Sequence, residues 1–182
     1  SGNMFSGLLA NVLNSGEVVE ENKIQAILPK IINFFKRLGY MESSSHDIFE
    51  QYLRMGEGAK PIIVGYENQV IEFSVQNPEV WNKLKQRVRI IYPVPTVWSS
   101  HPLIALTEKS RRLLEALKDT DIQRIAWKEH GFRTQMVSSE EINSLNIEGI
   151  PEQINKVIPM PGPKVMDVII QTLGNETLPQ NN

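Results

Sequence analysis

Apolar residues recur at helical spacing in several stretches of the chain. Met4, Leu8 and Val12 mark the first such stripe, which predicts an amphipathic helix ended by Asn14-Ser15-Gly16. Six further stretches carry the same periodicity or a clear helix start. They predict helices over residues 21–37, 47–55, 77–84, 108–117, 119–130 and 163–173.

A second pattern consists of short, continuous apolar runs. Residues 61–66 form such a run between turn signals, and residues 88–94 and 103–106 resemble it. A run without alternation is typical of a buried strand in a mostly parallel sheet covered on both faces. Because these runs alternate with predicted helices, the sequence predicts an α/β fold.

The predicted sheet is incomplete. Three strands are too few for a doubly wound sheet, so we expect a partial sheet flanked by helices. The chain also enters a helical pattern directly after Ser1-Gly2-Asn3, which suggests that it is the C-terminal portion of a longer protein. Unpaired strand edges around residues 92–96 would then expose apolar surface, and we expect self-association through them.

Composition limits the class of protein. The chain is 41% hydrophobic and 22% charged, which is ordinary for a soluble globular domain, and its net charge of −2 gives no general attraction to nucleic acid. No apolar window reaches the length of a membrane span. The absence of cysteine excludes disulfides, thiolate metal sites and cysteine nucleophiles.

Catalytic and metal motifs are missing from the sequence. His46, His101 and His130 lie in separate predicted elements, without a second ligand at metal spacing, and are interpreted as residues at the ends of elements. Serine-hydrolase, phosphate-loop and dinucleotide-binding signatures are absent. Glu20-Glu21 and Glu140-Glu141 fit helix starts better than an acid/base couple. We therefore expect neither an enzyme nor a cofactor.

Two places have the chemistry of a binding site. Ser1, Gly2 and Asn3 precede a helix, where unpaired N–H groups favour an oxyanion or carboxylate. Tyr66 and Glu67 follow a predicted buried strand, at the sheet edge where ligands bind in open α/β folds. The alternatives are a plain helix cap at the first place and a simple turn into the next helix at the second.

The same places resemble type 2 periplasmic solute-binding proteins. Ser1-Gly2-Asn3-Met4-Phe5 is similar to the helix start that opens their second lobe, and Val64-Gly65-Tyr66-Glu67-Asn68 to a strand exit of that lobe. Residues 92–96 resemble the strand that returns through the interlobe hinge, and 101–106 the strand after it. Residues 114–132 are similar to the C-terminal helix pair of molybdate-type members.

The resemblance implies both a function and an organisation. In this family two lobes close on a ligand and deliver it to the subunits of a membrane transporter, in the periplasm or outside the cell, with a membrane anchor in some full-length proteins. Carried over by position, the ligand contacts are Ser1, Gly2, Asn3, Tyr66 and Glu67. Residues 1–87 would form the ligand-binding segment of the second lobe. Residues 88–182 would supply the hinge return strands and C-terminal helices.

Two departures leave the ligand open. Glu67 would oppose a multiply charged oxyanion unless a basic residue compensates it, and Tyr66 lacks the adjacent tyrosine that ferric-binding relatives use. A sensory or interaction module of the same fold, fused to a signalling or adhesion domain, is the alternative function. An enzyme with its catalytic residues in another part of the protein is a third.

Overall fold

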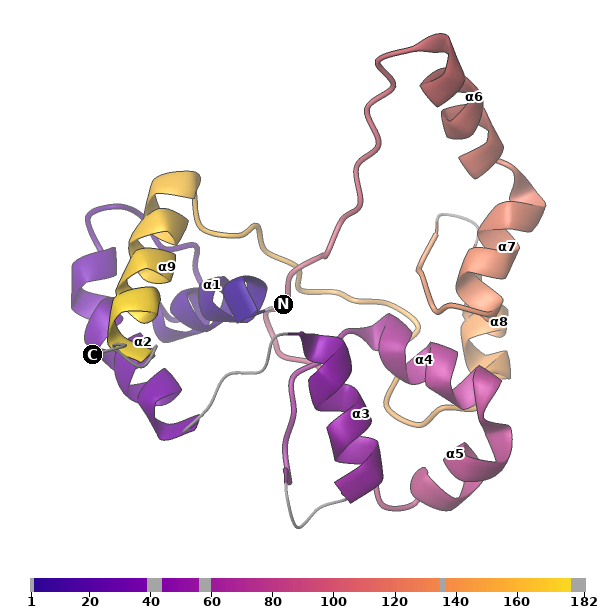
Figure 1. Cartoon of the computed structure of the whole chain (residues 1–182), viewed down its shortest axis with the longest axis horizontal. Helices are drawn as coiled ribbons and strands as arrows, with labels where there is room; N and C mark the ends of the chain where they lie inside the picture. Colours follow the sequence, from indigo (N-terminus) through magenta and orange to yellow (C-terminus); the bar gives the residue numbers. More distant parts are fainter. Residues whose placement is uncertain (1, 39–43, 56–59, 135–136, 178–182) are drawn as a thin grey trace, which may run out of the picture. The chain divides into compact units, whose positions relative to one another are not determined.

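The computed structural model describes residues 2–38, 44–55, 60–134 and 137–177, and within these ranges the regular elements are α-helices (Figure 1). They are α1 (Gly2–Leu13), α2 (Ile24–Leu38), α3 (Ser45–Met55), α4 (Glu67–Gln76), α5 (Pro78–Leu84), α6 (Glu108–Leu117), α7 (Thr120–Lys128), α8 (Ser139–Ser144) and α9 (Pro163–Thr177).

The chain divides into two compact units. Unit 1 comprises Ser1–Val64, Tyr92–Ser99 and Asn155–Asn182, and unit 2 comprises Gly65–Ile91 and Ser100–Ile154. The domain boundary predicted between residues 87 and 88 lies inside unit 2. The chain passes from unit 2 into unit 1 at residues 91 and 92, where the segment interpreted as a hinge return begins.

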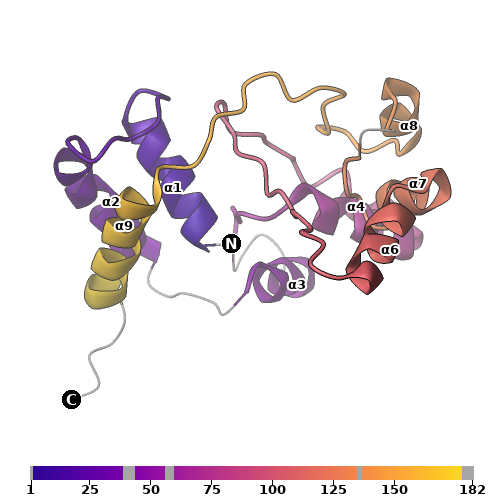
Figure 2. The same ribbon diagram turned by 90° about the horizontal axis from the view of Figure 1, so that it is seen from above.

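In unit 1, α1, α2 and α9 pack side by side around an aliphatic core (Figures 1 and 2). Ile31 on α2 and Ile169 on α9 are fully buried, together with Ala10 on α1. The apolar stripe of α2 runs through Pro29 without loss of the helix. The amphipathic pattern of each helix is what buries this core.

A buried asparagine links three segments of unit 1. Asn11 is fully buried on α1; its Oδ1 accepts from the backbone amide of Val19 at 3.0 Å, and its Nδ2 donates to the carbonyl of Pro159 at 3.0 Å. The side chain therefore fixes the loop after α1 and the approach to α9. It also satisfies the backbone amide of Val19, which lies away from water.

Unit 2 contains α4 to α8, and its core is built around two indoles. Trp127 on α7 is fully buried and Trp81 on α5 nearly so, with Ile71 of α4 and Ile142 of α8 packed against them. Its helices begin at clear caps, such as the Thr107–Ser110 pair before α6 and Asp119 before α7.

The prediction of an α/β fold is wrong, because no β-sheet forms within the described residues. The predicted strands at 61–66, 88–94 and 103–106 have no ladder partner. None of their apolar side chains is buried and several are largely exposed, such as Ile62 at 87% and Ile104 at 76%, although Ile90 packs partly against the core of unit 2. A continuous apolar run indicates a preference for burial, but a strand also needs a neighbour to pair its backbone groups. The described chain supplies only an isolated parallel bridge, between Thr96 and Val157.

The helix predictions are confirmed. The helices expected near residues 4–13, 21–37, 47–55, 77–84, 108–117, 119–130 and 163–173 are all present, with boundaries shifted by a few residues. No range was predicted for α4 or α8, although Glu140-Glu141 was expected at a helix start and α8 begins there.

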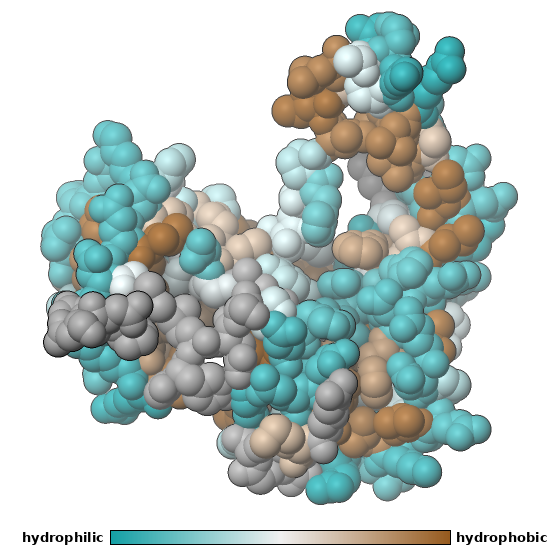
Figure 3. All heavy atoms as spheres, in the orientation of Figure 1, coloured by the Kyte–Doolittle hydropathy of each residue, from teal (hydrophilic) through white to brown (hydrophobic). Residues whose placement is uncertain are grey.

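Apolar side chains also remain exposed on α6. None of its residues is buried, and Leu113 and Leu117 present about half of their surface to solvent. Figure 3 shows hydrophobic side chains gathered over this helix. Self-association of the chain through such surfaces stays a prediction. No helix in the described ranges combines the length and apolar character needed to cross a membrane.

Candidate functional site

The residues predicted to contact a ligand fall in different units. Ser1 lies outside the described residues, and Gly2 and Asn3 begin α1 in unit 1. Tyr66 and Glu67 begin α4 in unit 2. The two groups are therefore considered one at a time.

At the start of α1, the side chains of the predicted residues are exposed. Asn3 presents its amide to solvent, while its backbone carbonyl accepts the hydroxyl of Ser6 at 2.9 Å. Ser6 itself is buried in the first turns of the helix. This geometry is that of an ordinary helix start, and no second functional group of unit 1 converges on it within the described residues.

At the start of α4, Tyr66 stands in extended conformation just before the first helical residue. Its backbone amide donates to Gln69 Oε1 at 2.9 Å, which closes one half of a capping box. The phenol does not cap the helix and has no hydrogen-bond partner among the described residues. The hydroxyl of Tyr66, which is half-buried, is therefore available to a ligand.

Glu67 is compensated by a base that the sequence analysis did not identify. Arg133 Nε donates to Glu67 Oε1 at 2.7 Å and Nη2 donates to Oε2 at 3.1 Å, so the guanidinium binds both carboxylate oxygens. The two side chains are only 14% and 15% exposed. A bidentate pair this well shielded from water is stronger and better oriented than a surface ion pair.

Arg133 also holds a second segment of unit 2. Nη2 donates to the carbonyl of Pro151 at 2.6 Å, and Nη1 donates to the carbonyl of Glu152 at 3.1 Å. The guanidinium carbon lies 5.6 Å from the centre of the Trp127 ring, within the range of a cation–π contact. With four hydrogen bonds from five N–H groups, Arg133 neutralises and orients Glu67 and has little capacity left for a ligand.

A left-handed glycine places this arginine. Gly131 has φ +70°, and its amide donates to Trp127 O, which is the bond of a left-handed C-cap that ends a helix. The next amide, of Phe132, donates to Ala126 O. A Cβ at Gly131 would lie 2.8 Å from the Cα of Asn68 on α4. Only glycine permits this approach, which brings the chain after α7 against the first turn of α4.

The same turn brings a histidine to α4. His130 Nδ1 lies 2.7 Å from Glu72 Oε1, in a pair that is partly exposed. His46 lies 3.4 Å from Glu50 on α3, and the ring of His101 meets Phe132 edge-on. The three histidines stay apart, and no group of three or more metal-ligating side chains converges within the described ranges.

Arg133, His130 and Glu72 were missed as members of this site. No spacing rule joins Glu67 to Arg133, since the two residues are 66 positions apart. The available signal was chemical: Glu67 next to a binding-competent tyrosine required a basic partner. The helix predicted over residues 119–130 does end before Gly131. The basic partner of Glu67 is Arg133, two positions after this glycine.

The arrangement suits binding better than catalysis. It combines a phenol without a partner among the described residues with a carboxylate whose charge is offset. Comparison of the chain with known protein families, with curated proteins and with solved structures finds no match.

Proposed function

We propose that the chain is a small-ligand-binding module that serves as an extracytoplasmic solute-binding component of a membrane transport system. The proposal has two parts that rest on different observations. Ligand binding rests on the start of α4. Transport rests on the sequence resemblance to type 2 periplasmic solute-binding proteins at residues 1–5 and 114–132, where the expected helices are present; the strands expected of the other matched segments do not form within the described residues. The subunits of a membrane transporter are the partners that this function requires.

The observation that carries ligand binding is the unused hydroxyl of Tyr66. A half-buried phenol usually finds a hydrogen-bond partner in the protein. Arg133 holds the neighbouring Glu67, and Gln69 accepts the backbone amide of Tyr66, so the backbone that carries the phenol is anchored. The hydroxyl has no partner among the described residues and is free to bind a ligand.

Arg133 also changes the class of ligand that this place tolerates. An isolated Glu67 carboxylate would repel an anion, whereas a bidentate Glu67–Arg133 pair presents no net charge. A small ligand that carries one anionic group is therefore not repelled at this place.

Native mass spectrometry of the protein, purified without denaturation from its producing cells, tests the binding function. We expect a retained small molecule, and we expect Tyr66→Phe to weaken its binding about 2- to 12-fold, the loss of one neutral hydrogen bond. Tyr52→Phe, at a half-buried tyrosine of α3, is the matched control and should leave the affinity unchanged. Absence of any retained molecule, or equal effects of the two variants, would contradict the proposal.

A further inference from the structure

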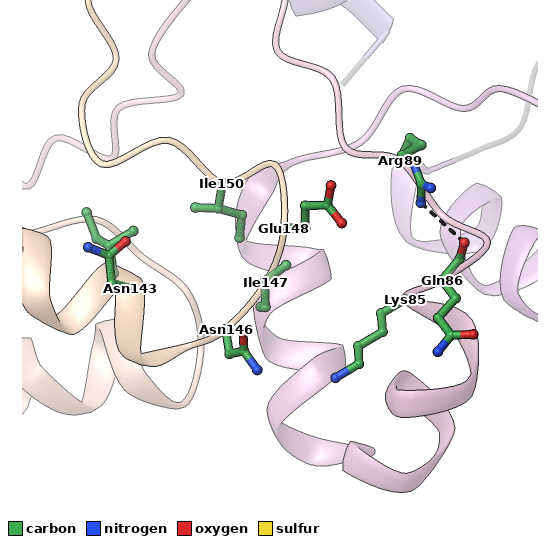
Figure 4. A pocket seen from close by; sticks show the side chains of 9 residues that line it. Lys85, Gln86, Arg89, Asn143, Asn146, Ile147, Glu148 and Ile150 are labelled. Carbon is green, nitrogen blue, oxygen red and sulfur yellow. Dashed lines mark hydrogen bonds between the residues drawn. The ribbon is translucent and has the colours of Figure 1, made fainter.

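A pocket lies wholly within unit 2, and neither Tyr66 nor Arg133 lines it. It has a volume of about 490 Å³ and is formed by the end of α5 with the residues after it on one side, and by α8 with the residues after it on the other (Figure 4). This volume lies within the range of small-molecule binding pockets.

Two cations line the pocket without a carboxylate partner. Lys85 is half-buried, and its ammonium makes no ion pair or hydrogen bond within the described residues. Arg89 Nη1 donates only to backbone carbonyls of its own segment, at 3.2 Å to Gln86 and 3.1 Å to Val88. Both groups therefore retain the capacity to bind an anion.

A carboxylate lines the same pocket. Glu148 forms no ion pair with any described residue, and Figure 4 shows its side chain on the opposite wall, between Ile147 and Arg89. The wall is held in place by Gly149, at φ +94°, where a Cβ would lie 2.8 Å from the carbonyl oxygen of Ile90. This close approach ties the segment after α8 to the segment that carries Arg89.

The rest of the lining is mixed and more polar than apolar. Gln86, Asn143 and Asn146 contribute amides, while Ile142 and Ile147 belong to the buried core of unit 2 and Ile150 packs against that core. The pocket thus joins two unpaired cations and one unpaired carboxylate to a largely polar wall.

We propose that this pocket binds a zwitterion, which is the chemistry of a free amino acid or a short peptide. The carboxylate of the ligand binds Lys85 and Arg89, and its ammonium binds Glu148. A simple anion would leave Glu148 unpaired, and a simple cation would leave both basic groups unpaired, so neither matches the lining as well.

Isothermal calorimetry with defined probes tests this proposal. Leucine represents a free amino acid and Leu-Leu a short peptide. Leucinamide lacks the carboxylate, and 4-methylpentanoate lacks the ammonium. We expect leucine or Leu-Leu to bind, and each of the other two probes to bind at least about tenfold more weakly, through loss of one charge-assisted contact.

Substitution of the residues that line the pocket tests the same proposal from the side of the protein. Lys85→Gln and Glu148→Gln should each raise the Kd of the better probe at least about tenfold. Lys83→Gln and Glu140→Gln are matched controls, because both residues are exposed and neither lines the pocket. Circular dichroism confirms that each variant is folded.

Two results would overturn the proposal. One is failure of both leucine and Leu-Leu to bind at millimolar concentration. The other is binding that Lys85→Gln and Glu148→Gln reduce no more than their controls do. Because the pocket uses neither Tyr66 nor Arg133, these results are independent of the native mass spectrometry that tests the start of α4.

Discussion

The two units of the chain build their cores in different ways. Unit 1 packs three helices of 12 to 15 residues, and its core is almost entirely aliphatic and phenylalanine carbon. Unit 2 packs helices of 6 to 10 residues around two indoles, and a largely buried ion pair joins Glu67 to Arg133, 66 positions away along the chain. Long amphipathic helices specify a core through local pattern, whereas short ones depend on contacts that close only in the folded chain.

This difference is accompanied by a difference in surface. Unit 2 carries the 490 Å³ pocket with unpaired charges. Unit 1 has its polar interior contacts concentrated on Asn11. Binding groups thus gather where the core is assembled from distant segments, which is where loops can be positioned by a rigid scaffold.

Removal of the central indole of unit 2 is expected to have the largest effect. Trp127→Ala should lower the free energy of unfolding by about 3–5 kcal/mol, because it empties a fully buried site. Trp127→Phe should cost less, since the indole N–H has no hydrogen-bond partner to lose among the described residues. Denaturant unfolding measures the loss of unfolding free energy, and hydrogen exchange shows which helices lose protection.

Protection should fall in α4 and α7 while α2 and α9 keep theirs. Trp98→Ala is the control, because that indole is 50% exposed in unit 1 and its loss should be small. Equal loss of protection in both units would show that they unfold as one cooperative body, and would break the comparison.

Loss of the buried ion pair is expected to come next. Arg133→Met should cost about 3 kcal/mol, near the lower limit for buried pairs, because it strands the carboxylate of Glu67 with little access to water. Glu67→Gln in the same protein should recover part of that loss. The exposed pair of Arg124 and Asp121 is the control: Arg124→Met should cost at most about 1 kcal/mol. Similar losses in denaturant titrations would show that burial of the Arg133 pair has no energetic consequence.

The smallest of the three effects is expected in unit 1. Asn11→Ala should cost about 2 kcal/mol, since it leaves the amide of Val19 and the carbonyl of Pro159 without partners. Asn22→Ala, at an exposed position before α2, should be nearly neutral. Thermal unfolding of the two variants measures the difference between their stabilities. If Asn11→Ala were as mild as its control, the buried amide would not be what joins the segments of unit 1.

The sequence predicted the helices of unit 1 well because their period extends over several turns, as along α2. It failed for the strands, since the apolar run at 61–66 indicates what the residues prefer but not whether a neighbouring strand exists. At the candidate site, the sequence identified the phenol of Tyr66 and the need to compensate Glu67. The identity of the compensating Arg133 depends on the left-handed turn at Gly131, a contact over 66 positions that local pattern does not encode.

The path of the chain through the two units has a practical consequence for dissecting the protein. The polypeptide crosses from one unit to the other after residues 64, 91, 99 and 154, so unit 1 is assembled from three separate stretches. A single proteolytic cut cannot release it, and no contiguous gene fragment encodes it alone. Unit 2 lies within residues 65–154 and is interrupted only by the passage 92–99. Expression of that fragment, with the passage kept or replaced by a short linker, is therefore the direct route to an isolated unit.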